Sequence, residues 1–415
     1  MKEIILFIKV SNAVRRSLET ASKQNLKNPI NSYITFAKMK CTAFFSDWHN
    51  IVFFCFCLIS FVQVFYYLFF FLRLTFYKPK SKQVSQTHPI SVVVCARDEA
   101  GNLAMNLPGI LVQHYHSTHE VIVVNDNSFD DSKYVLEAFK KNFKQLQIVE
   151  LKQEAKMIPG KKFPLSVGIK TAKHEILLLT DADCVPASEL WIEKMQSMYD
   201  DETEIVLGYA PFHHSKSMLN KIVRWECYHS ALQYFSYALA GMPYMGVGRN
   251  LSYRKKLFLQ TKGFSSHNHI SGGDDDLFIN MVANKKNTKL MLDPDSFMLS
   301  KPATTWKQWK RQKNRHYSTG KYYQFKHQFL LGLYSFSHFL YYPLLISSFI
   351  FFDWKWVLGV FGIRFILQLI VHRKCTNRLG EHDLFPLFLL MDIWMFVYYL
   401  IFAPSLVKKQ MPHWK

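Results

Sequence analysis

Two aspartates separated by one residue, Asp181 and Asp183, follow a short apolar run that reads EILLLT over residues 175–180. The run is apolar on both alternating faces, which predicts a buried parallel strand. Ligands of open α/β sheets bind beyond the carboxyl ends of such strands, where two neighbouring carboxylates repel each other unless a positive group lies between them. We therefore expect a divalent cation carrying phosphate oxygens at this pair. The alternative is a loop in which Asp181 caps the next helix.

The elements around this pair alternate between strand and helix patterns. Apolar, β-branched runs predict strands at 90–95, 120–124, 147–151 and 175–180, and helical patterns follow at 102–114, 131–142, 161–173 and 188–199. Alternation at this spacing predicts a doubly wound parallel sheet. Because acids follow three of the strands, we expect Asp98, Asp126 and the Asp181/Asp183 pair to share one pocket. Alternatively, these acids are ordinary helix N-caps.

Long apolar runs flank this region. Residues 51–74 form a nearly uncharged run of the length that crosses a bilayer, and 329–352, 357–371 and 384–406 are similar. The run at 357–371 is short and carries Arg364, so it is also consistent with a re-entrant or interfacial segment. The predicted organisation is a basic N-terminal segment (1–50), a transmembrane helix (51–77), a catalytic domain (88–300), a basic amphipathic interfacial segment (301–328) and a C-terminal membrane region of two to three hydrophobic segments (329–407).

The net charge of +20 is compatible with nucleic acid, an anionic membrane surface or anionic substrates as partners. Basic residues directly flank the apolar runs, which favours acidic lipid over nucleic acid. The residues concerned are Arg73, Lys78, Lys80, Lys82, Lys307, Lys310, Arg311, Lys313, Arg315, Lys321 and Lys326. We expect a multi-pass protein of the cell (inner or plasma) membrane with a cytoplasmic central domain. Lys408 and Lys409 agree with this orientation only if an even number of crossings follows the domain. The seven cysteines include no C-x-x-C pair, which favours a reducing compartment.

Six motifs occur in order along the chain: VVVCARDEAGN (92–102), VVNDNSFDD (123–131), residues 161–168, TDAD (180–183), GGDDDL (272–277) and QKNRH (312–316). Residues 88–320 thereby resemble the membrane-bound inverting glycosyltransferases of family 2, similar to cellulose, hyaluronan and glucosylceramide synthases. The resemblance implies an α/β fold of the GT-A type, in which a Rossmann-like, mostly parallel sheet forms the catalytic domain and transmembrane helices flank it.

The resemblance also implies a site for a nucleotide-diphosphate sugar, usually a UDP-sugar. It assigns Asp126 to the base and ribose, Lys161 to the diphosphate, and Asp181 and Asp183 to the diphosphate and a Mg²⁺ or Mn²⁺ ion, with Asp183 as the more direct ligand. Lys162 is an alternative to Lys161. Further donor contacts are expected from Ala96, Arg97 and Glu99 of the first motif and from Arg249 and Asn250 of the loop GVGRN (246–250).

The family pattern Glu-Asp-x-x-Leu contains the catalytic base. Anchoring it on Leu277 places the base at Asp274 and puts Gly273 where the family has Glu. Asp275 is the alternative base, one residue on, and a plain helix start is the structural alternative for the whole cluster. Gln312, Arg315 and His316 match the pattern Q-x-x-R-W with His in place of Trp. The resemblance pairs Arg315 with diphosphate oxygens and places the ring in the acceptor pocket; the stretch also reads as a basic helix on lipid.

The expected function is transfer of a sugar from a nucleotide-diphosphate donor to a lipid or cell-surface glycan, as in cell-envelope polysaccharide biosynthesis. One alternative is a polyprenyl-phosphate glycosyltransferase that makes a lipid-linked sugar, although such enzymes usually lack the 312–316 motif. Another is a non-enzymatic basic membrane protein, which leaves the acids at three strand ends unexplained. The expected partners are a nucleotide sugar, the acceptor and membrane lipids, without nucleic acid.

Overall fold

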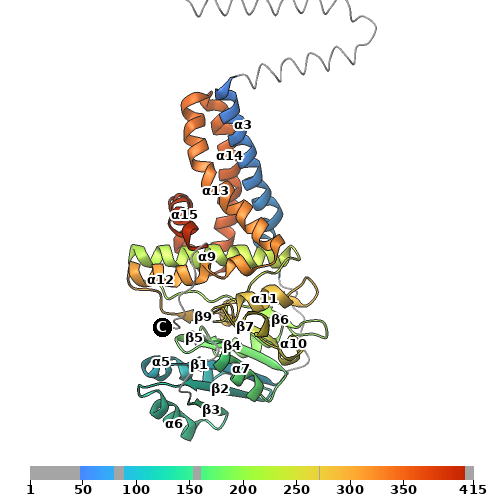
Figure 1. Ribbon diagram of the computed structural model, residues 1–415, viewed down its shortest axis with the longest axis vertical. Coiled ribbons are helices and arrows are strands. Elements are labelled where there is room, and N and C mark those ends of the chain that lie inside the picture. The colour runs from blue at the N-terminus through green and yellow to red at the C-terminus, as the bar shows by residue number, and fades with distance from the viewer. Residues whose placement is uncertain (1–46, 79–87, 153–159, 271, 407–415) are drawn as a thin grey trace, which may run out of the picture.

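The structure, a computed structural model, describes residues 47–78, 88–152, 160–270 and 272–406. It consists of an α/β domain, a layer of crosswise helices above it, and a bundle of long helices that points away from the domain (Figure 1). The basic segment predicted at 1–50 lies almost wholly outside the described residues, as do Lys80, Lys82, Lys408 and Lys409.

A seven-stranded sheet forms the centre of the α/β domain, in the order β3-β2-β1-β4-β7-β6-β8. Its first four strands in space are parallel, β7 runs antiparallel to β4 and β6, and β6 pairs in parallel with β8. A separate antiparallel pair joins β5 to β9. The strands are β1 (Ile90–Ala96), β2 (His119–Asp126), β3 (Leu146–Leu151), β4 (Ile176–Asp181), β5 (Cys184–Pro186), β6 (Ile205–Leu207), β7 (Leu251–Arg254), β8 (Thr288–Leu290) and β9 (Met298–Ser300).

Helices cover both faces of the sheet. The domain contains α5 (Ala100–Leu111), α6 (Ser132–Asn142), α7 (Lys162–Thr171), α8 (Trp191–Gln196), α10 (Lys255–Gln260) and α11 (Asp276–Val282), with 3₁₀ turns η2 (Ser265–His267) and η3 (Pro294–Ser296). Alternate strand residues point to opposite faces, so Val92 packs with α5 and α8 while Val93 packs with α7. The strands predicted from the alternation are therefore confirmed. The helix predicted at 188–199 is shorter than expected, because Ser188 bonds the Asp295 carbonyl at 3.0 Å instead of entering a helix.

Gly168 allows α7 to lie close to the sheet. A Cβ atom at this position would lie 2.6 Å from Cγ1 of Val93 and 3.0 Å from Cγ2 of Val124. Only a residue without a side chain lets the helix approach β1 and β2 at this distance. This close approach fixes the position of Lys161, which directly precedes the helix.

Four stretches of the described residues are long and apolar enough to cross a membrane: Trp48–Thr75, Phe325–Phe351, Trp354–Arg378 and His382–Phe402. The first is continuous through α3 (Trp48–Tyr66), the π-helical turn η1 (Tyr67–Phe71) and α4 (Leu72–Thr75). The others contain α13 (Phe325–Phe351), α14 (Trp354–Arg378), and η5 (His382–Leu387) followed by α15 (Phe388–Phe402) and η6 (Ala403–Leu406). Helices α3, α13 and α14 run side by side, and α15 lies beside the part of α13 nearer the domain (Figure 1).

The run at 357–371 is thus not short: it is the middle of the 25-residue helix α14. Arg364 is buried there because it has partners from other helices, which the local sequence does not reveal. Its Nη2 lies 2.9 Å from Oδ2 of Asp392 in α15 and 3.4 Å from Oε1 of Gln63 in α3, and within α14 its Nη1 donates to Gln368 at 3.1 Å. Its guanidinium also lies 4.1 Å from the ring centroid of Tyr341. An ionised side chain inside a helical bundle is tolerated when it is paired in this way.

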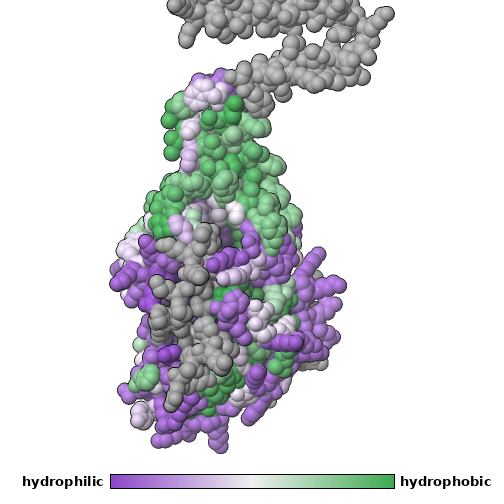
Figure 2. Space-filling model, viewed as in Figure 1, coloured by the Kyte–Doolittle hydropathy of each residue, from purple (hydrophilic) through white to green (hydrophobic). Residues whose placement is uncertain are grey.

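Two helices lie crosswise between the bundle and the α/β domain: α9 (Met218–Leu239) and α12 (Trp306–Tyr317) (Figure 1). One hydrophobic core continues from the sheet through α9 into the bundle, as Leu177, Tyr237, Phe70 and Met391 belong to the same cluster. The outer surface of the bundle is hydrophobic, whereas that of the domain below it is mainly hydrophilic (Figure 2). The segment predicted at 301–328 contains α12 and the 3₁₀ turn η4 (Gly320–Tyr322).

The Arg364–Asp392 pair gives a prediction about stability. Asp392→Leu leaves Arg364 buried without its counterion, and loss of one partner of a buried pair costs about 3–5 kcal/mol. We expect this variant to unfold at a clearly lower temperature than the wild type in detergent. The matched double variant Arg364→Met/Asp392→Leu should recover most of that stability, because it removes both charges. If the double variant is no more stable than the single one, the pair is not what holds α14 against α15.

Candidate active site

A cavity of about 1260 Å³ opens beyond the carboxyl ends of β1 and β4, below the crosswise helices. Most of the residues singled out from the sequence line it, although they come from segments more than two hundred positions apart. The predicted residues in its wall are Arg97, Glu99, Lys161, Asp181, Asp183, Arg249, Asp274, Asp275, Gln312, Arg315 and His316. The parallel strand order accounts for the convergence, because it brings the end of β4 between β1 and β7.

Lys161 forms an ion pair with Asp181 at the end of β4. Burial lowers the pKa of this lysine, but the adjacent carboxylate outweighs that effect and the net shift is upward. Burial likewise raises the pKa of Asp181, and the lysine reverses the shift. Lys162, the alternative candidate, instead donates to the carbonyls of His267 (2.5 Å) and Ile270 (2.8 Å). Lys161 is therefore the lysine that faces the Asp181/Asp183 pair.

Asp183, unlike Asp181, forms no ion pair with Lys161. Burial and repulsion by Asp181 raise the pKa of its carboxyl, and Arg249 opposes the shift. Glu99 lies close enough to raise this pKa further. Carboxylate oxygens are the ligands that Mg²⁺ and Mn²⁺ prefer, and a cation between Asp181 and Asp183 would relieve their repulsion. The residues present thus fit a divalent cation.

Arg249 is fixed in the cavity wall, whereas its neighbour Asn250 is not part of the wall. The guanidinium of Arg249 lies 4.4 Å from the ring centroid of Phe212 and donates to the hydroxyl of Ser300. The Asn250 amide is fully buried. It donates to the carbonyls of Tyr209 and Ser296, both at 2.8 Å, and accepts from Trp191 Nε1 at 3.0 Å. The expected donor contact of Asn250 is therefore wrong, because the core uses its amide.

Three other residues of the first motifs lie outside the cavity wall. Ala96 and Asp126 are fully buried at the ends of β1 and β2, so the contact of Asp126 with a nucleotide stays a prediction. Asp98 is exposed, has a left-handed backbone (φ 52°) and accepts from the Phe129 backbone N–H at 2.8 Å. The expectation that Asp98 shares the pocket of Asp181 is wrong, because its carboxylate joins two neighbouring loops instead.

The three adjacent aspartates face different ways. Asp275 accepts from the backbone N–H of Gly248 and of Asp276, both at 2.7 Å, and caps α11. Asp276 accepts from the hydroxyls of Thr319 (2.5 Å) and Tyr323 (2.8 Å). Burial, then repulsion by the two flanking carboxylates, raises the pKa of Asp275 to about 7. The helix start predicted as an alternative is present, but it uses Asp275 and does not account for the other two.

Asp274 lines the cavity on the side of Lys161 and Lys162 and acts electrostatically on both lysines. Among hydrogen bonds between described residues, none holds its carboxylate. Gly273 precedes it with φ 88°, and a Cβ there would collide with the side chain of Leu277. This turn explains why glycine stands where the family pattern has glutamate, since L-residues with side chains rarely adopt such a backbone.

Helix α12 places Gln312, Arg315 and His316 in the opposite wall of the cavity. His316 is exposed within the cavity, where desolvation, with Lys313 and Arg315 nearby, lowers the pKa of its ring. The helix is held by Glu226 of α9. This buried carboxylate forms an ion pair with Lys313 (2.6 Å) and accepts from Trp309 Nε1 (3.0 Å) and from the Tyr398 hydroxyl (2.7 Å) of α15.

The sequence analysis missed Glu226, Thr319 and Tyr323. Glu226 lies in the middle of a helix more than eighty residues before its partners Trp309 and Lys313, so no local pattern marks it. Thr319 and Tyr323 follow the 312–316 motif closely. Their hydroxyl groups, in a stretch rich in aromatic residues, could have marked them as candidates for the site.

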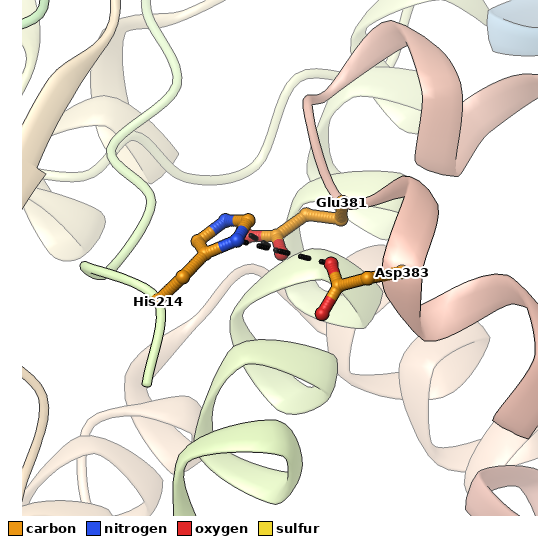
Figure 3. A group of neighbouring side chains, drawn as sticks. All are labelled: His214, Glu381 and Asp383. Atoms are coloured by element: carbon orange, nitrogen blue, oxygen red, sulfur yellow. Dashed lines mark ion pairs between the residues drawn. The ribbon is translucent and has the colours of Figure 1, made fainter. Parts of the chain in front are cut away.

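His214, Glu381 and Asp383 form a second group of potential metal ligands, away from this cavity (Figure 3). The imidazole lies 3.7 Å from a Glu381 oxygen and 3.9 Å from an Asp383 oxygen. Arg224 already bonds both carboxylates, with Nε 2.9 Å from Glu381 and Nη1 2.9 Å from Asp383. The guanidinium thus supplies the positive charge that an ion would, and the group joins α9 to the connection after α14.

Two family descriptions match this chain. Residues 91–260 match "Glycosyl transferase family 2" and residues 204–406 match "Glycosyl transferase family group 2". The two matches overlap and together cover the α/β domain, the crosswise helices and the helices α13 to α15.

The chain is also similar to individual proteins. It is 27% identical over 125 residues to a beta-monoglucosyldiacylglycerol synthase of Nostoc sp., and the match covers 29% of this chain and about a quarter (26%) of that relative. The mannosyltransferase PcManGT of Pyrobaculum calidifontis, solved with GDP-Man and Mn²⁺, superposes with a TM-score of 0.54 at 15% identity and covers 83% of this chain and 99% of its own. TarS of S. aureus (residues 1–349, with UDP-GlcNAc) is more distant, with a TM-score of 0.39 at 13% identity over 75% of this chain and 89% of its own.

Proposed function

We propose that this chain, a family 2 glycosyltransferase with a GT-A catalytic domain, transfers a sugar with inversion from a nucleotide-diphosphate donor, most simply a UDP-sugar, to a lipid or cell-surface glycan. One observation carries the proposal. A single cavity brings the metal-type pair Asp181/Asp183, the acidic cluster 274–276 and the basic helix α12 together. These are the groups needed to bind a diphosphate and to deprotonate an acceptor hydroxyl.

The donor side of the proposal rests on the charges at the end of β4. Asp181 and Asp183 would hold a Mg²⁺ or Mn²⁺ ion, which supplies positive charge to the departing diphosphate. Lys161, Arg249 and Arg315 line the same cavity, and they are cations that can pair with phosphate oxygens. The similarity to PcManGT supports the GT-A fold. Because that structure is a complex with GDP-Man and Mn²⁺, a nucleotide sugar and a divalent ion are the ligands to test on this protein.

The transfer step uses the carboxylate of Asp274. The acceptor hydroxyl oxygen attacks the anomeric carbon from the side opposite the diphosphate, and its proton passes to Asp274. The bond from the anomeric carbon to the diphosphate oxygen breaks, and the nucleoside diphosphate leaves with that electron pair. Asp275 is the less suitable base, because backbone N–H groups occupy both of its oxygens.

Two rival functions can be compared with this one. The first rival is a non-enzymatic basic membrane protein, and the matches to two glycosyl transferase families argue against it. A polyprenyl-phosphate acceptor is the alternative within the family, and the 312–316 motif in the cavity wall favours the first proposal over it.

We further infer that the protein lies in the cell membrane with its catalytic domain in the cytoplasm. Helix α12 lies between the domain and the bundle (Figure 1), and its residues Lys307, Lys310 and Arg311 are exposed, as contact with acidic lipid on the cytoplasmic side would require. Three candidate spans follow the domain; α13 and α14 lead away from it and back, and α15 lies beside the part of α13 nearer the domain (Figure 1). We propose that α13 and α14 cross the membrane and α15 does not, which makes the number of crossings even.

The metal assignment predicts that chelation abolishes sugar transfer. In excess EDTA, release of nucleotide from the sugar donor should fall to background, and Mg²⁺ or Mn²⁺ should restore it, because the charge on the departing diphosphate then regains its counterion. Asp183→Asn should stay inactive at every metal concentration, whereas the exposed control Asp201→Asn should respond as the wild type does. Full activity in excess chelator would remove the metal from the proposal.

The base assignment predicts that Asp274→Asn lowers kcat by about 10²–10⁴-fold, the usual contribution of a general base. Nucleotide affinity, measured by titration calorimetry, should change little, because other groups bind the diphosphate. If Asp274→Asn is active and Asp275→Asn is not, the base lies one residue further on. If both variants transfer sugar at the wild-type rate, the cluster serves only to start α11.

The orientation predicts which cysteines a membrane-impermeant maleimide can reach in intact cells. In a variant whose native cysteines are replaced, Lys355→Cys at the far end of the bundle should be labelled directly. Lys141→Cys on the exposed surface of α6 should be labelled only after the membrane is permeabilised. Labelling of Lys141→Cys in sealed cells would contradict a cytoplasmic domain.

A further inference from the structure

The active-site cavity does not end at the acidic cluster. It continues past Tyr398 and Tyr399 and reaches the two helices α13 and α15, both of which belong to the candidate membrane spans. In this part, which we call the apolar arm, the wall is made by Leu331, Phe336, Phe339, Met395 and Leu400. No motif of the sequence analysis pointed to these residues.

We propose that the apolar arm receives the hydrocarbon chain of a lipid acceptor with a hydroxyl headgroup, which enters sideways from the membrane between α13 and α15. The inference rests on the function proposed above, because it takes the acidic end of the cavity as the place of transfer. Of the two acceptor classes in that proposal, a lipid and a glycan, this inference selects the lipid.

The chemistry of the wall distinguishes these two acceptor classes. A glycan has hydroxyl groups along its whole length, and each one placed against Leu, Phe or Met side chains loses its hydrogen bonds to water without replacement, which costs free energy. A hydrocarbon chain gains free energy in the same place. The polar groups of Ser335, Tyr398 and Tyr399 lie in the cavity wall beside the apolar arm, where the head of an amphiphile would pass into its chain.

The size and the shape of the cavity agree with two ligands bound at once. Pockets for one small molecule usually have about 300–1,000 Å³, and this cavity has about 1260 Å³. The arm is open at Gly332 of α13, where an added Cβ would meet no atom within 4 Å.

The test is photolabelling of the full-length protein in phosphatidylcholine vesicles. The probe is a diacylglycerol with a diazirine at the middle of one acyl chain, and the labelled peptides are identified by mass spectrometry. We expect labels on the cavity-facing residues Phe336, Phe339 and Met395. Gly332→Trp, which fills the arm, should reduce this labelling to background. The matched variant Gly359→Trp, at an equally open glycine of α14 outside the cavity, should leave it unchanged.

Two results would overturn the inference. One is labelling spread evenly over the outer surface of the bundle, for example at Ile363 and Ile366, and unaffected by Gly332→Trp, which would mean contact with bulk lipid only. The other is loss of the label when a soluble oligosaccharide is added, which would make the arm a glycan channel. The labelling needs no donor, so it can succeed where nucleotide release fails, and the two proposals can fail separately.

Discussion

Mutual repulsion among carboxylates is the constraint on which the arrangement of this active site depends. Asp181, Asp183 and the cluster 274–276 lie in the wall of one cavity. Three of them are stabilised by different positive or hydrogen-bonding groups: Lys161 for Asp181, backbone N–H groups for Asp275, and two hydroxyls for Asp276. Asp183 and Asp274 are the two that we propose to bind a cation and a proton. In the proposed function, two of these five aspartates take part directly in the chemistry.

A second interaction connects this chemistry to the membrane helices. Glu226 is buried in α9 and binds side chains of α12 and α15 together. Because α12 carries Arg315 and His316, the position of this part of the cavity wall depends on helices of the hydrophobic bundle. The continuous core from Leu177 to Met391 has the same effect. The catalytic domain and the bundle are therefore one packed unit, and a ligand in the cavity can contact both.

The sequence predicted the parts of the fold in which local pattern and burial agree. The strands around Val93 and Leu178 are apolar on both faces, and the sheet buries both faces. Prediction was poorer where the conformation of a side chain depends on a partner that is distant in the sequence. Arg364 made the apolar run of α14 look too polar for a full span. Its counterion Asp392 lies twenty-eight residues further along the chain, so the local sequence does not show the pair. Asn250 looked like a ligand-binding residue of a loop, but the carbonyls of Tyr209 and Ser296 hold it in the core.

By itself the sequence determined the alternation of strands and helices between residues 90 and 199, the four apolar stretches, and the residue types that could bind a diphosphate, because these follow from composition and spacing along the chain. Only the tertiary structure decided which candidates meet. It turned Asp98 away from the cavity, chose Lys161 over Lys162, and showed why Gly273 replaces a glutamate. It also joined the acidic site to the apolar wall of α13 and α15. The physical reason is that hydrogen bonds and charge pairs between distant segments depend on side-chain directions, which are fixed only when the helices pack against the sheet.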